Sequence, residues 1–170
     1  SALREAKNSS YFIDRVRKLG LNVEILSGEE EALLSFKGAK AGLDISGPAL
    51  VVDIGGGSTE LILGEKQILK SESLPVGAVR YTHKYFKSEP PITKDVEEAS
   101  AVISQLTDDF SKTLNQIRQM YEVTPVGVGG TLTTLSAMAQ ELKVYDREKI
   151  HGFVLQKNYV DSIYSKLLNL

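Results

Sequence analysis

Two carboxylates flank three adjacent glycines in the segment Asp53 to Glu60, which reads Asp-Ile-Gly-Gly-Gly-Ser-Thr-Glu. β-branched residues precede and follow the glycines, which predicts two strands joined by a turn, with Asp53 and Glu60 near each other across the hairpin. Gly55, Gly56 and Gly57 allow positive φ and a close approach to a ligand, and successive N–H groups in such a turn form a concave anion site. Because carboxylate oxygens suit Mg²⁺, the segment predicts phosphate chemistry with a cation, in preference to an ordinary glycine-rich hairpin.

A second glycine-rich segment runs from Gly127 to Thr134. It is predicted to join a strand over residues 125–130 to a helix over residues 131–142, and the first N–H groups of a helix are a ready anion site. Taken alone, a tight turn that needs glycine only for packing explains the segment equally well. Beside the first glycine segment, a role in phosphate binding gains weight.

An acidic run, Glu29 to Glu31, falls in the first turn of a predicted helix, where the helix macrodipole favours negative charge. Such a run is usually a solvated face. Hydrolysis of a phosphoanhydride nevertheless requires a carboxylate that activates water, and this run is a candidate for it. Arg4 matches phosphate geometry, although a lone arginine in a helix is more often a surface residue.

Other charged residues are interpreted without a catalytic role. Arg80, Lys84 and Lys87 form a basic face that could guide a polyanion but is more simply a solvated surface. The two histidines, His83 and His151, have no partners at ligand spacing.

Composition indicates a globular protein with a real core. The chain has 170 residues, a net charge of −2 and no cysteine, which argues against a nucleic-acid-binding surface and excludes disulfides and thiolate metal sites. No apolar run approaches the ~20 residues that cross a bilayer, so we expect a soluble, cytoplasmic protein with no membrane partner. Because it begins without Met and in helix-like sequence, we expect it to be a piece of something longer.

The order of predicted elements indicates an α/β fold. Three early strands joined by short turns predict an antiparallel meander, followed by alternating helices and strands, which is the order of a ribonuclease H-like lobe. A stretch of small residues at 38–48 is the best candidate for a lobe boundary. The predicted strands cover residues 22–26, 50–54, 60–64, 67–76, 125–130 and 153–156, and the predicted helices cover residues 9–19, 29–36, 77–86, 93–117, 131–142 and 159–168.

Together these features resemble the exopolyphosphatase/guanosine pentaphosphate phosphohydrolase (Ppx/GppA) family of the actin, sugar-kinase and Hsp70 superfamily. The Asp-x-Gly-Gly-Gly-Ser-Thr-Glu element in this setting is specific, whereas a glycine-rich loop alone is weak. The resemblance covers nearly the whole chain, through residues 2–8, 25–32, 51–61, 74–80, 127–135 and 145–152.

The resemblance implies a two-lobed enzyme, dependent on Mg²⁺ or another divalent cation, that removes phosphate from polyphosphate ends or from guanosine pentaphosphate. Glu31 matches the catalytic carboxylate, with Glu30 as a competitor, and Asp53 and Glu60 match the acidic residues of the cation site. The residues that match phosphate-binding positions are Arg4, Gly55, Gly56, Gly57, Ser58, Gly129, Gly130 and Thr131.

One departure from the family is large. Members begin with another phosphate loop, Asp-x-Gly-Ser-Asn, which this sequence lacks, together with about the first hundred residues expected from usual domain sizes. The resemblance therefore implies that residues 1–44 are an incomplete part of a first lobe and that residues 45–170 form the second, ribonuclease H-like (actin-like ATPase) lobe with a mixed sheet. Because the chemistry of the family lies between lobes, we expect the chain alone to have little activity.

Two alternatives stay open. One is an ATP-using relative of the same superfamily, and the other is a non-hydrolytic module that binds polyphosphate or (p)ppGpp. The sequence does not choose between polyphosphate and guanosine pentaphosphate, because both end in the same phosphoanhydride. It also leaves the oligomeric state open, and a homodimer is possible.

Overall fold

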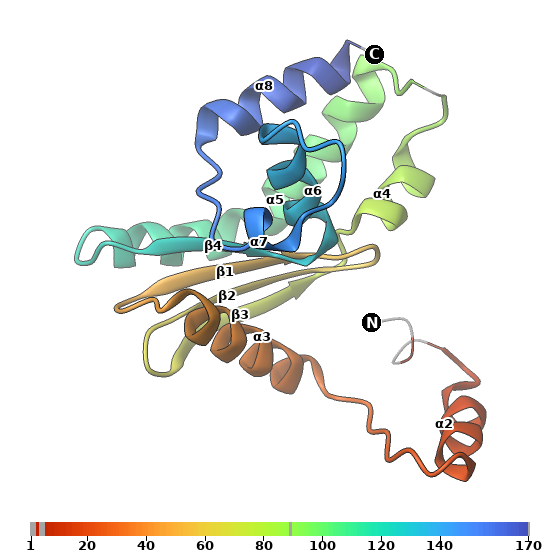
Figure 1. Cartoon of the computed structure of the whole chain (residues 1–170). Helices are drawn as coiled ribbons and strands as arrows, with labels where there is room; N and C mark the ends of the chain where they lie inside the picture. Colours follow the sequence, from red (N-terminus) through yellow and green to blue (C-terminus); the bar gives the residue numbers. More distant parts are fainter. Residues whose placement is uncertain (1–2, 4–5, 89, 170) are drawn as a thin grey trace.

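The computed structural model describes residues 3, 6–88 and 90–169. Four strands form one mixed sheet with helices on both of its faces (Figure 1). The α/β class and the three-strand meander expected from the sequence are therefore confirmed. The elements are α2 (Ser9–Lys18), α3 (Gly28–Leu43), β1 (Ala49–Ile54), β2 (Thr59–Gly64), β3 (Ile68–Leu74), α4 (Ala78–Tyr85), α5 (Thr93–Arg118), β4 (Thr124–Val128), α6 (Gly129–Ala139), α7 (Arg147–Ile150) and α8 (Lys157–Leu168).

The sheet has the strand order β3-β2-β1-β4. The strands β1, β2 and β3 pair antiparallel in sequence order, and β4 returns parallel to β1 after the long helix α5. The turn between β1 and β2 and the turn from β4 into α6 consequently lie at the same edge of the sheet, because β1 and β4 end there together. Both glycine-rich segments of the sequence are at that edge.

The face of the sheet that carries α3 holds one half of the core. Phe36 of α3 is 3% exposed and packs with Val51, Ile62 and Val126 from three strands. Strand alternation puts Asp53 on the same face as Val51, two residues further along β1. The helix that covers this face therefore lies over the face that presents Asp53.

The opposite face packs against α5. Leu61, Leu63 and Phe110 are buried there together. Lys70 of β3 extends this contact, because its Nζ donates to Asp109 Oδ2 at 2.7 Å and lies 5.6 Å from the centre of the Phe110 ring. The long helix is thus attached to the meander by apolar packing and by one charged group.

Replacement of Phe36 by Ala is expected to lower the free energy of unfolding by about 3–5 kcal/mol, because it leaves a cavity between α3 and the sheet. Urea denaturation followed by circular dichroism measures the change. Leu34→Ala on the same helix is the matched control, since Leu34 is 57% exposed and a surface change is expected to cost no more than about 0.5 kcal/mol. Equal losses in the two variants would contradict the assignment of Phe36 to the core.

Helix α3 is longer than the sequence indicates. It continues through Gly38 and Gly42 to Leu43, across the small-residue stretch that is a candidate lobe boundary. Leu43 and Ala39 pack against the core cluster of the sheet, so tertiary contacts outweigh the low helix propensity of glycine. A division of the chain at residue 44 stays a prediction, and the packing shows that α3 lies on the sheet that follows it.

Two short strands expected from the sequence, at residues 22–26 and 153–156, are wrong. Neither segment has regular secondary structure, and neither pairs with the sheet. A strand needs a partner as well as β-branched residues, and the local pattern does not show whether a partner is present.

Helix α2 contributes no buried residue and stands apart from the sheet in Figure 1. The chain leaves this helix through Gly20, whose φ of 81° is the left-handed conformation that glycine adopts easily. Within the described residues, none of the helices combines the length and the apolar character needed to cross a membrane.

Candidate phosphate and metal site

A row of polar side chains crosses the sheet where β1 ends. Asp53 of β1 is directly opposite Glu60 of β2, and Glu60 is directly opposite Ser73 of β3. Directly opposed residues of antiparallel strands present their side chains on the same face. Glu60 is only 8% exposed, and its Oε1 accepts a hydrogen bond of 2.9 Å from Ser73 Oγ.

Helix α3 carries in its first turn two glutamates, Glu30 and Glu31, that are candidates for a third carboxylate at this face. The hydrogen bonds at the N-terminus of the helix show that the two have different roles. Ser27 and Glu30 form a capping box: Ser27 N donates to Glu30 Oε2 at 2.8 Å, and Glu30 N donates to Ser27 Oγ at 3.2 Å. These hydrogen bonds lower the pKa of Glu30, the bond from the Ser27 backbone contributing most. The carboxylate of Glu30 is therefore occupied by the helix cap, whereas the negative charge of Glu31 helps to raise the pKa of Asp53.

The pKa of Asp53 is raised above its ordinary value. Burial is the largest cause, and the negative charges of Glu60 and then Glu31 add to it. Asp53 is thus within electrostatic reach of the other two predicted carboxylates. Like charges directly opposite on neighbouring strands are destabilising, so the cluster stores a repulsion that a cation would relieve.

Replacement of Asp53 by Asn is expected to stabilise the metal-free chain at neutral pH. Because the folded-state pKa of Asp53 lies above its unfolded value, the folded chain binds more protons between the two values, and the free energy of unfolding falls as pH rises through that interval. Asparagine does not titrate, so the variant does not lose this part of the free energy of unfolding. Urea denaturation in EDTA at several pH values measures it: the stability difference between variant and wild type should grow as pH rises above 3.8, the ordinary pKa of the carboxyl. A pH-independent difference would be the contrary result.

The glycine turn between β1 and β2 is held by the start of α4. Gly55 O accepts a hydrogen bond from Ala78 N at 3.0 Å, and Gly56 O accepts one from Arg80 N at 2.9 Å. The side chain of Arg80 then donates from Nε to Gly57 O at 2.7 Å. Three successive carbonyl groups of the turn are thus directed toward α4.

The N–H groups of the same peptides are directed the other way. A trans peptide sets its N–H group opposite its carbonyl group, so the N–H groups of Gly56, Gly57 and Ser58 point away from α4. Within the residues that the structure describes, no acceptor is recorded for them. Gly77 makes this arrangement possible, because a Cβ at that position would overlap the backbone of Gly56 and Gly57. The turn therefore presents three donors in series, which suits a phosphate group.

The second glycine segment lies against the first. Gly129 begins α6 with a φ of 83°, and a Cβ at that position would clash with Asp53 Oδ1. A hollow of about 490 Å³ is lined by residues of both segments, including Gly55, Gly56, Gly130 and Thr131. The fold therefore brings the two predicted phosphate segments together at one edge of the sheet, with Asp53 of β1 close to Gly129 of the second segment.

A divalent cation fits the donor set at Asp53 and Glu60 by its chemistry, because both supply hard carboxylate oxygens. Among the described residues, no group of three acidic, histidine or cysteine side chains converges closely enough to enclose an ion by itself. Mg²⁺ commonly binds through one or two carboxylates and completes its octahedral shell with water and substrate phosphates. Asp53 and Glu60 would then hold the ion from one side, with a phosphate ligand on the other.

Not every predicted residue is placed at this site. Arg4 lies outside the described residues. Of the basic face, only Arg80 contacts the glycine turn, whereas Lys84 Nζ lies 4.9 Å from the centre of the Tyr85 ring and Lys87 Nζ donates to Lys84 O at 2.8 Å.

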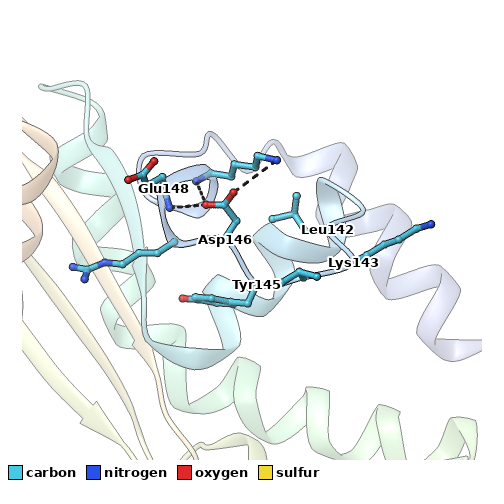
Figure 2. A pocket seen from close by; sticks show the side chains of 8 residues that line it. Leu142, Lys143, Tyr145, Asp146 and Glu148 are labelled. Atoms are coloured by element: carbon cyan, nitrogen blue, oxygen red, sulfur yellow. Dashed lines mark hydrogen bonds and ion pairs between the residues drawn. The ribbon is translucent and has the colours of Figure 1, made fainter.

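A second hollow, of about 540 Å³, is formed by residues 142–149, which belong to the loop after α6 and to the first residues of α7 (Figure 2). Figure 2 shows Asp146 directed into this loop, where Oδ1 accepts hydrogen bonds from the backbone of Glu148 and Lys149 at 3.1 and 3.4 Å. The carboxylate of Asp146 is used to start α7, and none of the predicted site residues lines the hollow.

Sequence comparison gives curated relatives of more than one kind. The chain is 37% identical over 158 residues to Exopolyphosphatase 2 of Mycobacterium tuberculosis, an alignment that covers 89% of this chain and 49% of that protein. It is 34% identical over 137 residues to guanosine-5'-triphosphate,3'-diphosphate pyrophosphatase of Aliivibrio fischeri, covering 79% of this chain and 27% of that protein. The chain thus spans about half the length of the first relative and about a quarter of the second.

Solved structures give the same result for the fold. The PPX-GPPA enzyme of Aquifex aeolicus superimposes with a TM-score of 0.84 at 32% identity, over 100% of this chain and 55% of that one. An exopolyphosphatase of Cytophaga hutchinsonii gives a TM-score of 0.84 at 26% identity, over 99% of this chain and 55% of that one. All residues from 1 to 170 also match the Ppx/GppA phosphatase family as a whole. The chain therefore belongs to the Ppx/GppA phosphatase family.

Proposed function

We propose that this chain forms the metal- and phosphate-binding wall of a phosphoanhydride hydrolase. The whole protein would release terminal phosphate from polyphosphate or guanosine pentaphosphate in the presence of Mg²⁺. The observation that carries this proposal is Asp53 directly opposite Glu60, beside the donor-rich glycine turn and on the sheet face that α3 covers. Residues 1–44 would belong to a first lobe and residues 45–170 to the second, with α3 packed on the sheet of the second.

Each group of residues has a distinct role in the proposal. Glu31 accepts a proton from the attacking water. The N–H groups of Gly56, Gly57 and Ser58 donate to phosphate oxygens and orient the terminal phosphoryl group, which favours in-line attack. Asp53 and Glu60 hold the divalent cation, which when bound neutralises charge on the phosphoryl oxygens. Little covalent chemistry is asked of the protein.

The names of the relatives support hydrolysis of a phosphoanhydride and leave two candidate substrates. One relative is an exopolyphosphatase and another is a pyrophosphatase for guanosine-5'-triphosphate,3'-diphosphate. Both of these substrates end in a phosphoanhydride, so a site that reads only the terminal phosphates accepts either. Polyphosphate and guanosine pentaphosphate are therefore proposed together.

A phosphate-release assay on the whole protein tests the proposal. The substrates are long-chain polyphosphate, guanosine pentaphosphate and ATP, each with Mg²⁺ and with EDTA. We expect release from at least one of the first two without any added nucleotide, and loss of release in EDTA. Release from ATP alone would support the ATP-using alternative, and tight binding of polyphosphate or guanosine pentaphosphate without release would support the non-hydrolytic module.

A further inference from the structure

Ser73 is the one residue of the polar row that the proposed function does not use. It lies on β3, outside both glycine segments, and its register puts it directly opposite Glu60. Its Oγ donates to Glu60 Oε1 at 2.9 Å. A serine on the exposed side of a strand is ordinary, but a serine that donates to a buried carboxylate is not.

The partner of this hydrogen bond explains why the donor matters. Glu60 is 8% exposed, and a buried carboxylate needs donors because it has lost most of its water. In the described part of the chain, Ser73 is the side chain recorded as a donor to Glu60, and no buried side-chain oxygen or nitrogen is left without a partner. On its other side, Glu60 meets Asp53, another carboxylate, which offers no donor when it is ionised.

The hydrogen bond also restricts the direction of the carboxylate. With Oε1 held by Ser73, the carboxylate of Glu60 cannot rotate freely, which leaves Oε2 and the second lone pair of Oε1 for a cation. Partners that fix a metal ligand in this way strongly affect metal affinity in other proteins. Ser73 itself has no need to touch the ion or the substrate.

We propose that Ser73 is a positioning residue that holds Glu60 in the orientation in which it binds the divalent cation. The proposal rests on the function proposed above, because it takes Glu60 as a cation ligand. It adds a residue from the third strand to a site that otherwise consists of residues from β1, β2, α3 and two glycine segments.

The chain offers a matched control on the same strand. Ser71 lies two residues before Ser73, so its side chain is on the same face, and its register partner is the apolar residue Ile62. Ser71→Ala makes the same chemical change as Ser73→Ala without a carboxylate opposite. Two further variants compare residues of equal shape at position 73: Ser73→Thr keeps the hydroxyl and Ser73→Val removes it.

The test is a Mn²⁺ titration of the whole protein followed by electron paramagnetic resonance, with the thermal midpoint of the metal-free protein measured alongside. We expect Ser73→Ala and Ser73→Val to weaken Mn²⁺ binding about 10-fold or more, while Ser73→Thr and Ser71→Ala stay within about twofold of wild type. In a phosphate-release assay, the Mg²⁺ concentration for half-maximal activity should rise by the same factor. Comparison of Thr with Val keeps the test valid if the alanine variant folds poorly.

The outcomes separate this inference from the proposed function. If wild type binds Mn²⁺ and all Ser73 variants bind it equally well, the positioning role is overturned and the proposed function stands. If Ser73→Val and Ser71→Ala lose affinity together, the effect belongs to the strand and not to the hydroxyl, which also overturns the role. If wild type binds no Mn²⁺ and releases phosphate in EDTA, the proposed cation site fails, and the role of Ser73 fails with it.

Discussion

Replacement of Glu31 by Gln in the whole protein is expected to lower the rate of phosphate release by about 10²- to 10⁴-fold, the usual contribution of a general base. Glutamine has the same shape but cannot accept a proton from water. Helix α3 should still form, because its capping box uses Ser27 and Glu30 and not Glu31. Binding of the substrate should therefore persist while turnover is lost, and a single-turnover assay alongside equilibrium binding measures the two separately.

The neighbouring glutamate supplies the control for this prediction. Glu30→Gln preserves the capping box, since glutamine at this position reaches back to the backbone as glutamate does. We expect its rate of phosphate release to stay close to wild type. A large loss in Glu30→Gln together with normal turnover in Glu31→Gln would assign the base to Glu30 and reject the role proposed for Glu31.

The second large effect is expected from Gly129→Ala. Gly129 has a φ of 83°, and a Cβ there would clash with Asp53 Oδ1. The left-handed conformation alone costs a residue with a side chain about 1–3 kcal/mol. Displacement of Asp53 should then also weaken Mg²⁺ binding, so the variant should lose both folding stability and metal affinity. Urea denaturation and a Mg²⁺ titration of phosphate release measure the two losses.

The adjacent glycine is the control for the stability part of this prediction. An added Cβ at Gly130 meets no other heavy atom within 4 Å, and Gly130 is not among the residues with positive φ. Gly130→Ala lies within α6, where alanine is favoured over glycine by up to about 1 kcal/mol. It should fold at least as stably as wild type. Equal destabilisation by the two substitutions would show that the left-handed turn at Gly129 is not the cause.

The part of the fold around the site could be predicted from the sequence because its signals are local. β-branched runs on either side of Gly55, Gly56 and Gly57 indicate a hairpin whatever the rest of the chain does, and the hairpin alone fixes Asp53 opposite Glu60. The strand-to-helix turn at Gly129 is equally local. These elements hold the candidate site, so its residues could be named before the fold was known.

The two wrong strands and the underestimated length of α3 depend on residues that are distant in the sequence. Residues 22–26 and 153–156 have β-branched or apolar character, but a strand exists only where another strand lies beside it. Helix α3 crosses two glycines because Phe36 and Leu43 pack on a sheet that follows it in the sequence. Neither the missing partner nor the sheet below the helix is visible in a short window of residues.

The capping box could have been predicted from the sequence, whereas the role of Ser73 could not. The spacing of Ser27 and Glu30, Ser-x-x-Glu before an apolar run, is the signature of a capping box and could have distinguished Glu30 from Glu31 without a structure. Ser73 has no such signal, because its role depends on the register between β2 and β3. That register includes a shift at Leu63 and Gly64, which residue counting along the hairpin does not predict.

Because the glycine turn is hydrogen-bonded to α4, amide groups of α4 can report whether a ligand occupies the turn. The amide hydrogens of Ala78 and Arg80 are bonded to Gly55 O and Gly56 O, so they exchange with solvent only when the turn separates from the helix. A ligand that binds the turn should slow this local opening and lengthen the exchange times of these two amides. Their resonances would then report occupancy in solution, in a spectrum that contains no signal from the ligand.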